Sequence, residues 1–234
     1  MNDTRHVLIT GASRGIGAHL VRHYLAHDDV VIGCARGAAT VTHKRYVHMC
    51  VDVTDEQAVH TLLGDIRKRF GALDVLINNA GIASMNPVAL TPFETARQIM
   101  ETNFLGTFAF TRAALRLLRS STAGRIVNFT TVAVPLRLEG EAIYAASKSA
   151  VETFTRIVAR EAAPFGVTCN AVGPSPVHTQ LTDNVPADRI DRLISRQAVP
   201  RWAEPDDVAN VIDFFLRRES AMVTGQIVYL GGIG

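Results

Sequence analysis

The sequence predicts a single α/β domain built on a doubly wound parallel sheet with helices on both faces. Apolar segments of strand length alternate with longer segments of helical periodicity along the whole chain, which is the pattern of such a sheet. The 234 residues fit one α/β domain, and no repeat, linker or low-complexity segment divides them. Aromatic residues make up only 6% of the chain, so small and β-branched residues must form the core, as strands buried on both faces require.

The first half of the chain contains four segments with strand character. Each is a short apolar run bounded by polar residues or glycine, and we expect strands at 5–10, 29–34, 46–51 and 73–77. A helical pattern follows the first strand at 18–26, and an amphipathic pattern over 55–70 predicts a second helix.

The second half predicts three more strands, at 124–129, 167–172 and 226–230. Helices are expected at 92–118, 145–163 and 205–216. The helix over 145–163 is rich in small residues, so its surface could pack closely against another copy of the chain. The polar segment 180–201 carries two apolar clusters and is expected to form a mobile lid over a substrate.

Charge and composition do not favour a nucleic-acid or membrane partner. The chain has 24 basic and 22 acidic residues with no block of like charge, and no apolar run approaches about 18 residues. The first strand begins near His6, which leaves no room for a signal peptide. Cys34, Cys50 and Cys169 are far apart in apolar runs, so we expect small core residues in a reducing, cytoplasmic compartment.

A glycine-rich turn, Gly11-Ala-Ser-Arg-Gly-Ile-Gly17, joins the first strand to the first helix. Strand, turn and helix in this order present backbone N–H groups and a helix N-terminus to a phosphate. The glycines do not follow the G-x-G-x-x-G spacing, and no Lys-Ser/Thr of a P-loop follows them. On the helix itself, His19, His23 and His27 recur every four residues. They could bind a metal, but the apolar stripe of this helix favours a solvent-facing position for them.

The end of the second strand indicates which dinucleotide fits. A site for NAD commonly has a carboxylate there, which holds the ribose 2′-OH. Here the strand ends in Ala35-Arg36, and Arg14 in the turn can reach the same region. Two planar guanidinium groups suit the 2′-phosphate of NADP, although two surface arginines are the alternative. Asp28 and Asp29 come too early in the chain for the ribose role.

Tyr144 and Lys148 lie four residues apart at the start of a predicted helix, and therefore on one face of it. A positive charge near a phenol lowers its pKa from about 10, so that it can exchange a proton with a carbonyl oxygen or an alcohol near neutral pH. The pair alone is a common pattern, and the alternative is an amphipathic tyrosine with a solvated lysine.

Several motifs together carry a family resemblance. Thr10 with the glycine turn resembles the Thr-Gly-x-x-x-Gly-x-Gly signature of the short-chain dehydrogenase/reductase family, and Asn78-Asn79-Ala80-Gly81 after the fourth strand matches its Asn-Asn-Ala-Gly. The resemblance continues along nearly the whole chain. It implies a Rossmann-type domain with seven parallel strands, a nicotinamide cofactor, and assembly into a homodimer or homotetramer.

The resemblance also implies a hydride-transfer site. Thr131 precedes Tyr144 by 13 positions, where the family normally has its catalytic serine. Its hydroxyl is expected to hold the substrate oxygen together with Tyr144, while the extra methyl stiffens the side chain and narrows the site. Asn103, a poor residue for a helix interior, is expected to disturb its helix and hold a water that connects to Lys148.

The same resemblance assigns the cofactor-binding residues. Asp52 would meet the adenine amino group, although it could equally cap the helix that begins near Asp55. Val177 and Thr179 would contact the nicotinamide carboxamide, but Ser175 replaces a usual glycine and adopts positive φ less easily. The expected NADP(H) set is Gly11, Ser13, Arg14, Gly15, Ile16, Gly17, Arg36, Asp52, Val53, Asn79, Ala80, Gly81, Tyr144, Lys148, Pro174, Val177 and Thr179.

These inferences favour an NADPH-dependent reductase of a small-molecule carbonyl compound, which could be bound to a carrier protein. Segment 132–143 is expected to line the substrate pocket, with Arg137 and Glu141 facing either a polar end of the substrate or water. Phe165 before Gly166, where 3-oxoacyl-carrier-protein reductases tend to have a basic residue, argues mildly against carrier docking. The alternative is a non-catalytic dinucleotide-binding or scaffold protein, which Thr131 and Ser175 would support.

Overall fold

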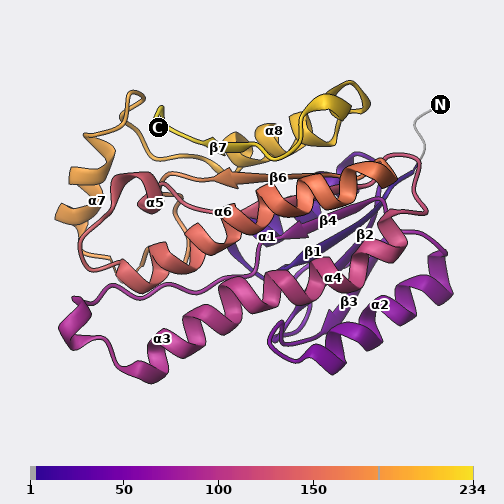
Figure 1. Ribbon diagram of the computed structural model, residues 1–234, viewed down its shortest axis with the longest axis horizontal. Coiled ribbons are helices and arrows are strands. Elements are labelled where there is room, and N and C mark those ends of the chain that lie inside the picture. Colours follow the sequence, from indigo (N-terminus) through magenta and orange to yellow (C-terminus); the bar gives the residue numbers. More distant parts are fainter. Residues whose placement is uncertain (1–3, 184, 234) are drawn as a thin grey trace.

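The computed structural model describes residues 4–183 and 185–233. Seven parallel strands form one sheet in the order β3-β2-β1-β4-β5-β6-β7 (Figure 1). The strands are β1 (His6–Thr10), β2 (Val30–Ala35), β3 (Tyr46–Cys50), β4 (Val75–Asn78), β5 (Arg125–Phe129), β6 (Thr168–Gly173) and β7 (Ile227–Tyr229). The predicted doubly wound parallel sheet is confirmed, and the chain reverses its direction of winding between β3 and β4.

Helices cover both faces of the sheet because successive strand residues point to opposite sides. Val7 and Ile9 of β1 pack with α1 (Gly15–Ala26) and α8 (Pro205–Leu216), whereas Leu8 packs on the other face. That other face is covered by three helices, which cross in front of the sheet in Figure 1. They are α2 (Glu56–Phe70), α4 (Gly106–Leu118) and α6 (Ala142–Ala162).

The helical tract predicted over 92–118 is interrupted in its middle. It consists of α3 (Phe93–Met100), a π-helical turn (Glu101–Leu105) and then α4. A π-helical turn inserts an extra residue into the helical ladder and is often found at functional sites. The buried residue of this turn is Asn103, so the expected disturbance of the helix at this position is confirmed.

The shorter helices lie in the connections. Segment 132–143 contains α5 (Ala133–Leu136), and segment 180–201 contains α7 (Ala187–Ile194). Figure 1 shows α5 and α7 at the same end of the molecule. Single 3₁₀ turns occupy Val88–Leu90, Ala163–Phe165 and Arg218–Met222. Within the described part of the chain, no helix is both long and apolar enough to cross a membrane.

Two expectations for the surface were wrong in part. Cys50 is exposed rather than a core residue, because it ends the edge strand β3, where its thiol reaches the Gly37 carbonyl (Sγ···O 3.6 Å). His19 and His23 are half-buried rather than solvent-facing, because α8 packs beside α1 and pairs them with Asp206 and Asp213. His27 is exposed, as expected.

Candidate active site

A cleft of about 990 Å³ opens at the carboxyl ends of the strands. In a doubly wound sheet, this is where the reversal of winding leaves room for a ligand. Most residues of the predicted cofactor set line the cleft: Gly11, Ser13, Arg14, Gly15, Ile16, Gly17, Arg36, Asp52, Val53, Asn79, Ala80, Gly81 and Thr179. The sequence pattern thus located one continuous surface, drawn from several separate segments.

The glycine turn is packed too tightly for side chains. A Cβ on Gly17 would lie 2.1 Å from the Gly11 carbonyl oxygen, and Gly11 itself adopts φ +68°. The Asn79 amide closes the turn by donating to the carbonyls of Thr10 (2.9 Å) and Gly11 (3.3 Å). Asn79 therefore links the end of β4 to the glycine turn, and the turn presents bare backbone to the cleft.

The N-terminus of α1 is free to receive an anion. Its N-cap residue, Arg14, makes no side-chain capping hydrogen bond, and the first turn of the helix contains no acidic residue. The first N–H groups of a helix have no partner inside the helix and carry a partial positive charge. Together with the bare glycine turn, this end fits the pyrophosphate of a dinucleotide.

The two predicted arginines both line the cleft. Arg14 and Arg36 are both exposed, and Arg14 donates to Gln180 at the start of the expected lid (2.5 Å). The early carboxylates are engaged elsewhere, since Asp29 pairs with Arg5 at 2.7 Å and Asp28 pairs with Arg45. The end of β2 therefore offers guanidinium groups, and no carboxylate, to a ribose.

Asp52 is not the helix cap. Its carboxylate accepts hydrogen bonds from the backbone N–H (3.0 Å) and hydroxyl (2.9 Å) of Thr54. Asp55 caps α2 instead, by accepting from Ala58 N at 3.0 Å. Of the two roles open to Asp52 from its sequence, helix capping is excluded, and its position in the cleft lining fits the cofactor role.

Tyr144 and Lys148 are buried in the first turns of α6, next to Thr131 at the end of β5. The Thr131 hydroxyl hydrogen-bonds the Tyr144 phenol. The Lys148 ammonium donates to the Phe129 carbonyl (2.9 Å). A Cβ on Gly81, which lines the cleft, would lie 3.4 Å from that ammonium, whereas Tyr144 and Lys148 themselves are not in the cleft lining.

Burial sets the ionisation of this pair. Desolvation, with a smaller contribution from Glu141, raises the pKa of Tyr144 to about 12, although the Thr131 hydrogen bond opposes the shift. Desolvation alone lowers the pKa of Lys148 to about 8. The expected lowering of the phenol pKa by Lys148 is not found, because burial raises this pKa and the only opposing contribution comes from Thr131. Tyr144 is thus a firmly protonated acid, and Lys148 a cation that is easily discharged.

Asn103 connects the loop after β4 to helix α6. Its side chain accepts from Ile82 N (2.8 Å) and donates to Ile82 O (2.9 Å) and Ser147 Oγ (3.0 Å). Ser147, fully buried, donates in turn to the Tyr144 carbonyl (2.7 Å). Sequence reasoning missed Ser147, although its place between Tyr144 and Lys148 on the helix was a usable signal.

Glu152 was also missed. This buried carboxylate accepts hydrogen bonds from Thr130 (2.5 Å) and Tyr229 (2.6 Å), and so anchors the residue before Thr131. An isolated glutamate in a helix gave no sign of that contact, which depends on strands β5 and β7 lying near α6. Glu152 holds the end of β5 in place from beneath the site.

Of the cofactor residues predicted after β6, only Thr179 lines the cleft. Thr179 lies over the glycine turn, where its methyl group would be 3.2 Å from a Cβ on Gly15. Val177 is buried and pairs with Ala203, and Pro174 accepts from Val132 N (3.4 Å), so neither is in the cleft lining. Among described residues other than glycine, positive φ occurs only at Asp28 and Arg137. Ser175 therefore fits its backbone without strain.

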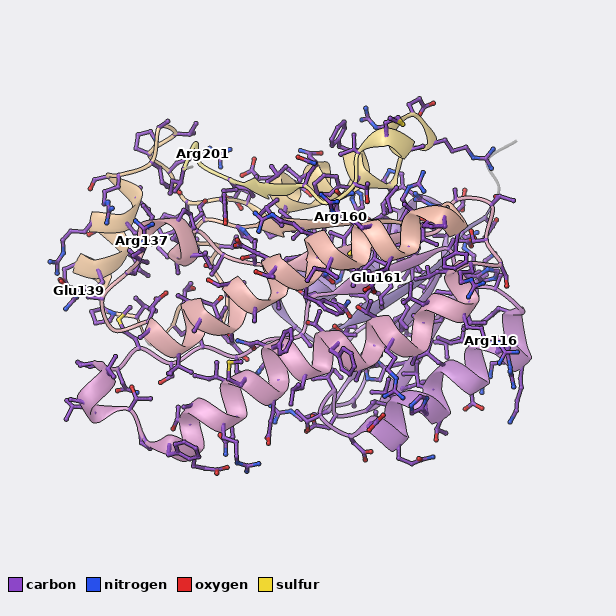
Figure 2. The ribbon with its side chains drawn as sticks, in the orientation of Figure 1. Arg116, Arg137, Glu139, Arg160, Glu161 and Arg201 are labelled. Carbon is purple, nitrogen blue, oxygen red and sulfur yellow. The ribbon has the colours of Figure 1, made fainter. Side chains whose placement is uncertain are left out.

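Of the two charged candidates for substrate contact, the structure brings only Glu141 into the cleft lining. Burial raises the pKa of its carboxyl group. Arg137 is exposed and lies outside that lining. Figure 2 shows Arg137 and Glu139 at the α7 end of the molecule, and Glu139 reaches Arg189 of α7 at 3.9 Å.

Comparison with known proteins agrees with this geometry. A family model described as enoyl-(acyl carrier protein) reductase matches residues 11–232. The chain is 32% identical to the 3-oxoacyl-(acyl-carrier-protein) reductase FabG of Vibrio harveyi, over 96% of this chain and 95% of that protein. It is 35% identical to a hexahydroindene-carboxyl-CoA reductase of Mycobacterium tuberculosis, over 97% and 91% of the two chains.

A similar solved structure is the ligand-free aldohexose dehydrogenase of Thermoplasma acidophilum, with a TM-score of 0.89 and 28% identity over 98% of this chain and 94% of that one. Fold and site thus define an oxidoreductase with a dinucleotide cleft. The chain belongs to the short-chain dehydrogenase/reductase family.

The glycine turn gives a direct test of the cleft. Gly17→Ala places a Cβ against the Gly11 carbonyl and must displace the turn, so we expect at least about tenfold weaker NADPH binding by fluorescence titration. Gly37→Ala is the matched control, because Gly37 lines the same cleft with no atom within 4 Å of its added Cβ. Equal affinities of the two variants would contradict the assignment.

Proposed function

We propose that this protein is an NADPH-dependent reductase that converts a ketone or 3-oxoacyl group to an alcohol, with Tyr144 as the general acid. The observation that carries the proposal is a buried phenol with a pKa of about 12, hydrogen-bonded to Thr131 and one helical turn from Lys148, beside a cleft with a phosphate-binding turn. The relatives named as reductases of 3-oxoacyl and acyl-CoA substrates support this class of substrate.

Each residue of the site has its own role in this reaction. When bound, the nicotinamide cofactor supplies the hydride. Thr131 and Tyr144 hold the carbonyl oxygen, and the phenol donates its proton to that oxygen as negative charge develops there. Lys148 then restores the proton to the phenol, because its own pKa of about 8 makes it a ready donor. The hydrogen bonds from Asn103 through Ser147 to the Tyr144 carbonyl hold Tyr144 in place, and Lys148 is held by the Phe129 carbonyl.

Arg14 and Arg36 support the preference for NADPH, since they offer planar donors at the ribose end of the cleft. Reduction is the direction that a firmly protonated tyrosine favours. The non-catalytic alternative gains no support, because Ser175 is unstrained and Asn103, Thr131, Tyr144 and Lys148 form one connected site.

The substrate-facing part of the cleft is mixed in character. Ile82, Met85, Leu181 and Val185 give it an apolar wall, and Glu141 adds one carboxyl group. Three basic residues on or directly after α4 could receive an acidic carrier protein, and two of them are engaged within the chain. Arg112 pairs with Glu56 (2.9 Å), and the Arg119 guanidinium lies 3.6 Å from the centre of the Phe165 ring. Free or CoA-linked carbonyl compounds therefore suit this surface better than carrier-bound ones.

Cofactor choice is tested by comparing NADPH and NADH. The two arginines predict at least about tenfold higher kcat/KM with NADPH, and Arg36→Asp should reverse the order, because it removes a phosphate donor and adds a carboxylate for the ribose hydroxyls. Arg22→Ala, an exposed arginine on α1 outside the cleft lining, is the control and should leave the ratio unchanged. Equal use of both cofactors by the wild type would rule out the role of Arg14 and Arg36.

The acid is tested by Tyr144→Phe. Removing one hydroxyl should lower kcat about 10²–10⁴-fold, which is the usual contribution of a positioned acid, while NADPH affinity stays within about twofold. Thr131→Ser should retain activity, and Thr131→Val should lose most of it. Substantial turnover by Tyr144→Phe would remove Tyr144 from the mechanism.

The lowered pKa of Lys148 predicts how kcat/KM for reduction falls at alkaline pH. Its pKa is lowered to about 8, so the cation is present below that pH and is lost above it, whereas Tyr144 stays protonated to about pH 12. The kcat/KM for reduction should therefore fall above about pH 8. In Lys148→Arg, any residual activity should lack this limb, because a guanidinium stays charged. A limb near pH 8 that persists in Lys148→Arg would contradict the assignment.

We also propose a homodimer or homotetramer that uses the α4–α6 face. Leu105, Phe108 and Ile157 are 40–50% exposed there, and Phe108 stacks edge-on against Phe154 of α6 at 6.1 Å. Such apolar side chains on adjacent helices suit contact with a second copy. Ile157→Asp should lower the mass found by sedimentation equilibrium, whereas Val199→Asp, at a similarly exposed site outside this face, should not. A monomeric wild type would refute the proposal.

A further inference from the structure

The seam between α1 and α8 gathers imidazole and carboxylate groups away from the cleft. His19 Nε2 lies 2.8 Å from Asp206 Oδ1, and His23 Nε2 lies 2.8 Å from Asp213 Oδ2. One ligand atom from each of His19, His23 and Asp206 lies within 4.8 Å of the others. None of these residues lines the cleft, so the proposed reaction does not account for them.

The contact between His19 and Asp206 is close without being a well-formed hydrogen bond. His19 Nε2 is buried from solvent and has no hydrogen-bond partner among the described residues, despite the 2.8 Å separation. Two donor atoms that approach in this way without a hydrogen bond are suited to bind one ion. A tetrahedral zinc site with bonds of about 2.1 Å separates its donor atoms by about 3.4 Å, and the three candidate ligand atoms lie within 4.8 Å of one another.

We propose that His19, His23 and Asp206 form a binding site for a divalent transition-metal ion of the zinc type. Two imidazoles four residues apart on one helix face, with a carboxylate from a second helix, supply the nitrogen and oxygen donors that Zn²⁺ prefers. Asp213 completes the surroundings of the site. Its carboxylate contacts His23 Nε2 (2.8 Å) and also accepts from the Tyr24 hydroxyl (3.1 Å). This contact leaves His23 Nδ1 to bind the ion, as outer carboxylates commonly orient metal-bound histidines through their other ring nitrogen.

The frame of the site is rigid. Leu20 and Tyr24 of α1 and Val208 and Ile212 of α8 are fully buried in the same core cluster, which fixes the spacing of the two helices. A bound ion would cross-link α8 to the helix whose N-terminus forms the phosphate site. We therefore expect metal binding to raise the melting temperature, because it stabilises only the folded chain.

The test is Zn²⁺ binding to the full chain without an affinity tag, measured by calorimetry at pH 7.5, together with the visible absorption of bound Co²⁺. The wild type should bind one ion per chain with micromolar or tighter affinity. His19→Gln and Asp206→Asn should each weaken binding at least about tenfold. His27→Gln is the matched control, since His27 also lies one helical turn from His23 but outside the cluster, and it should bind like the wild type.

Three results would overturn the proposal. The first is a wild-type protein that shows no saturable binding of Zn²⁺ up to about 100 μM. The second is an Asp206→Asn variant that binds Zn²⁺ as tightly as the wild type, because the ligands would then be only the two histidines of α1. The third is His27→Gln that weakens binding as much as His19→Gln does. Circular dichroism of each variant shows whether it is folded, and Asp206→Asn changes an exposed side chain, so the comparison does not depend on the buried core.

Discussion

The active site depends on one buried amide. Asn103 bonds both the N–H and the carbonyl of Ile82 and also bonds Ser147, so it fixes the loop after β4 against the first turns of α6. The π-helical turn places this side chain inward, at the cost of a regular helix. Gly81 in the cleft lining leaves room for both Asn103 and Lys148, since a Cβ there would lie 3.2 Å from the Asn103 oxygen and 3.4 Å from the Lys148 ammonium. If this amide were lost, the loop after β4 and the first turns of α6 would no longer be hydrogen-bonded to the same residue.

Burial, rather than charge pairing, decides the chemistry of the site. Tyr144 and Lys148 are both removed from water, and each therefore shifts toward its neutral form. A neutral phenol is the state that donates a proton, and a lysine near its titration point is the state that passes one on. Both shifts fit the proposed delivery of a proton to a carbonyl oxygen.

The sequence predicted the sheet well because buried parallel strands are continuous apolar runs, and each observed strand lies within about two residues of its expected range. It also located the cleft, since the glycine turn and Asn79 carry steric and hydrogen-bonding requirements visible in local sequence. It could not reveal contacts between distant segments. Glu152 with Tyr229, and His19 with Asp206, depend on how strands and helices pack. The pKa of the Tyr144 phenol was predicted to fall but is raised, because it depends on burial, which follows from the fold and is not visible in the local sequence.

The central claim is that Tyr144 delivers a proton while hydride reaches a carbonyl carbon from the bound nicotinamide. The most direct measurement is transfer of deuterium from NADPH labelled at C4 of the nicotinamide to a panel of ketones and 3-oxoacyl thioesters, with products analysed by mass spectrometry and NMR. The account predicts one deuterium on the new carbinol carbon of at least one product. A protein that binds NADPH yet transfers deuterium to none of these compounds would contradict it.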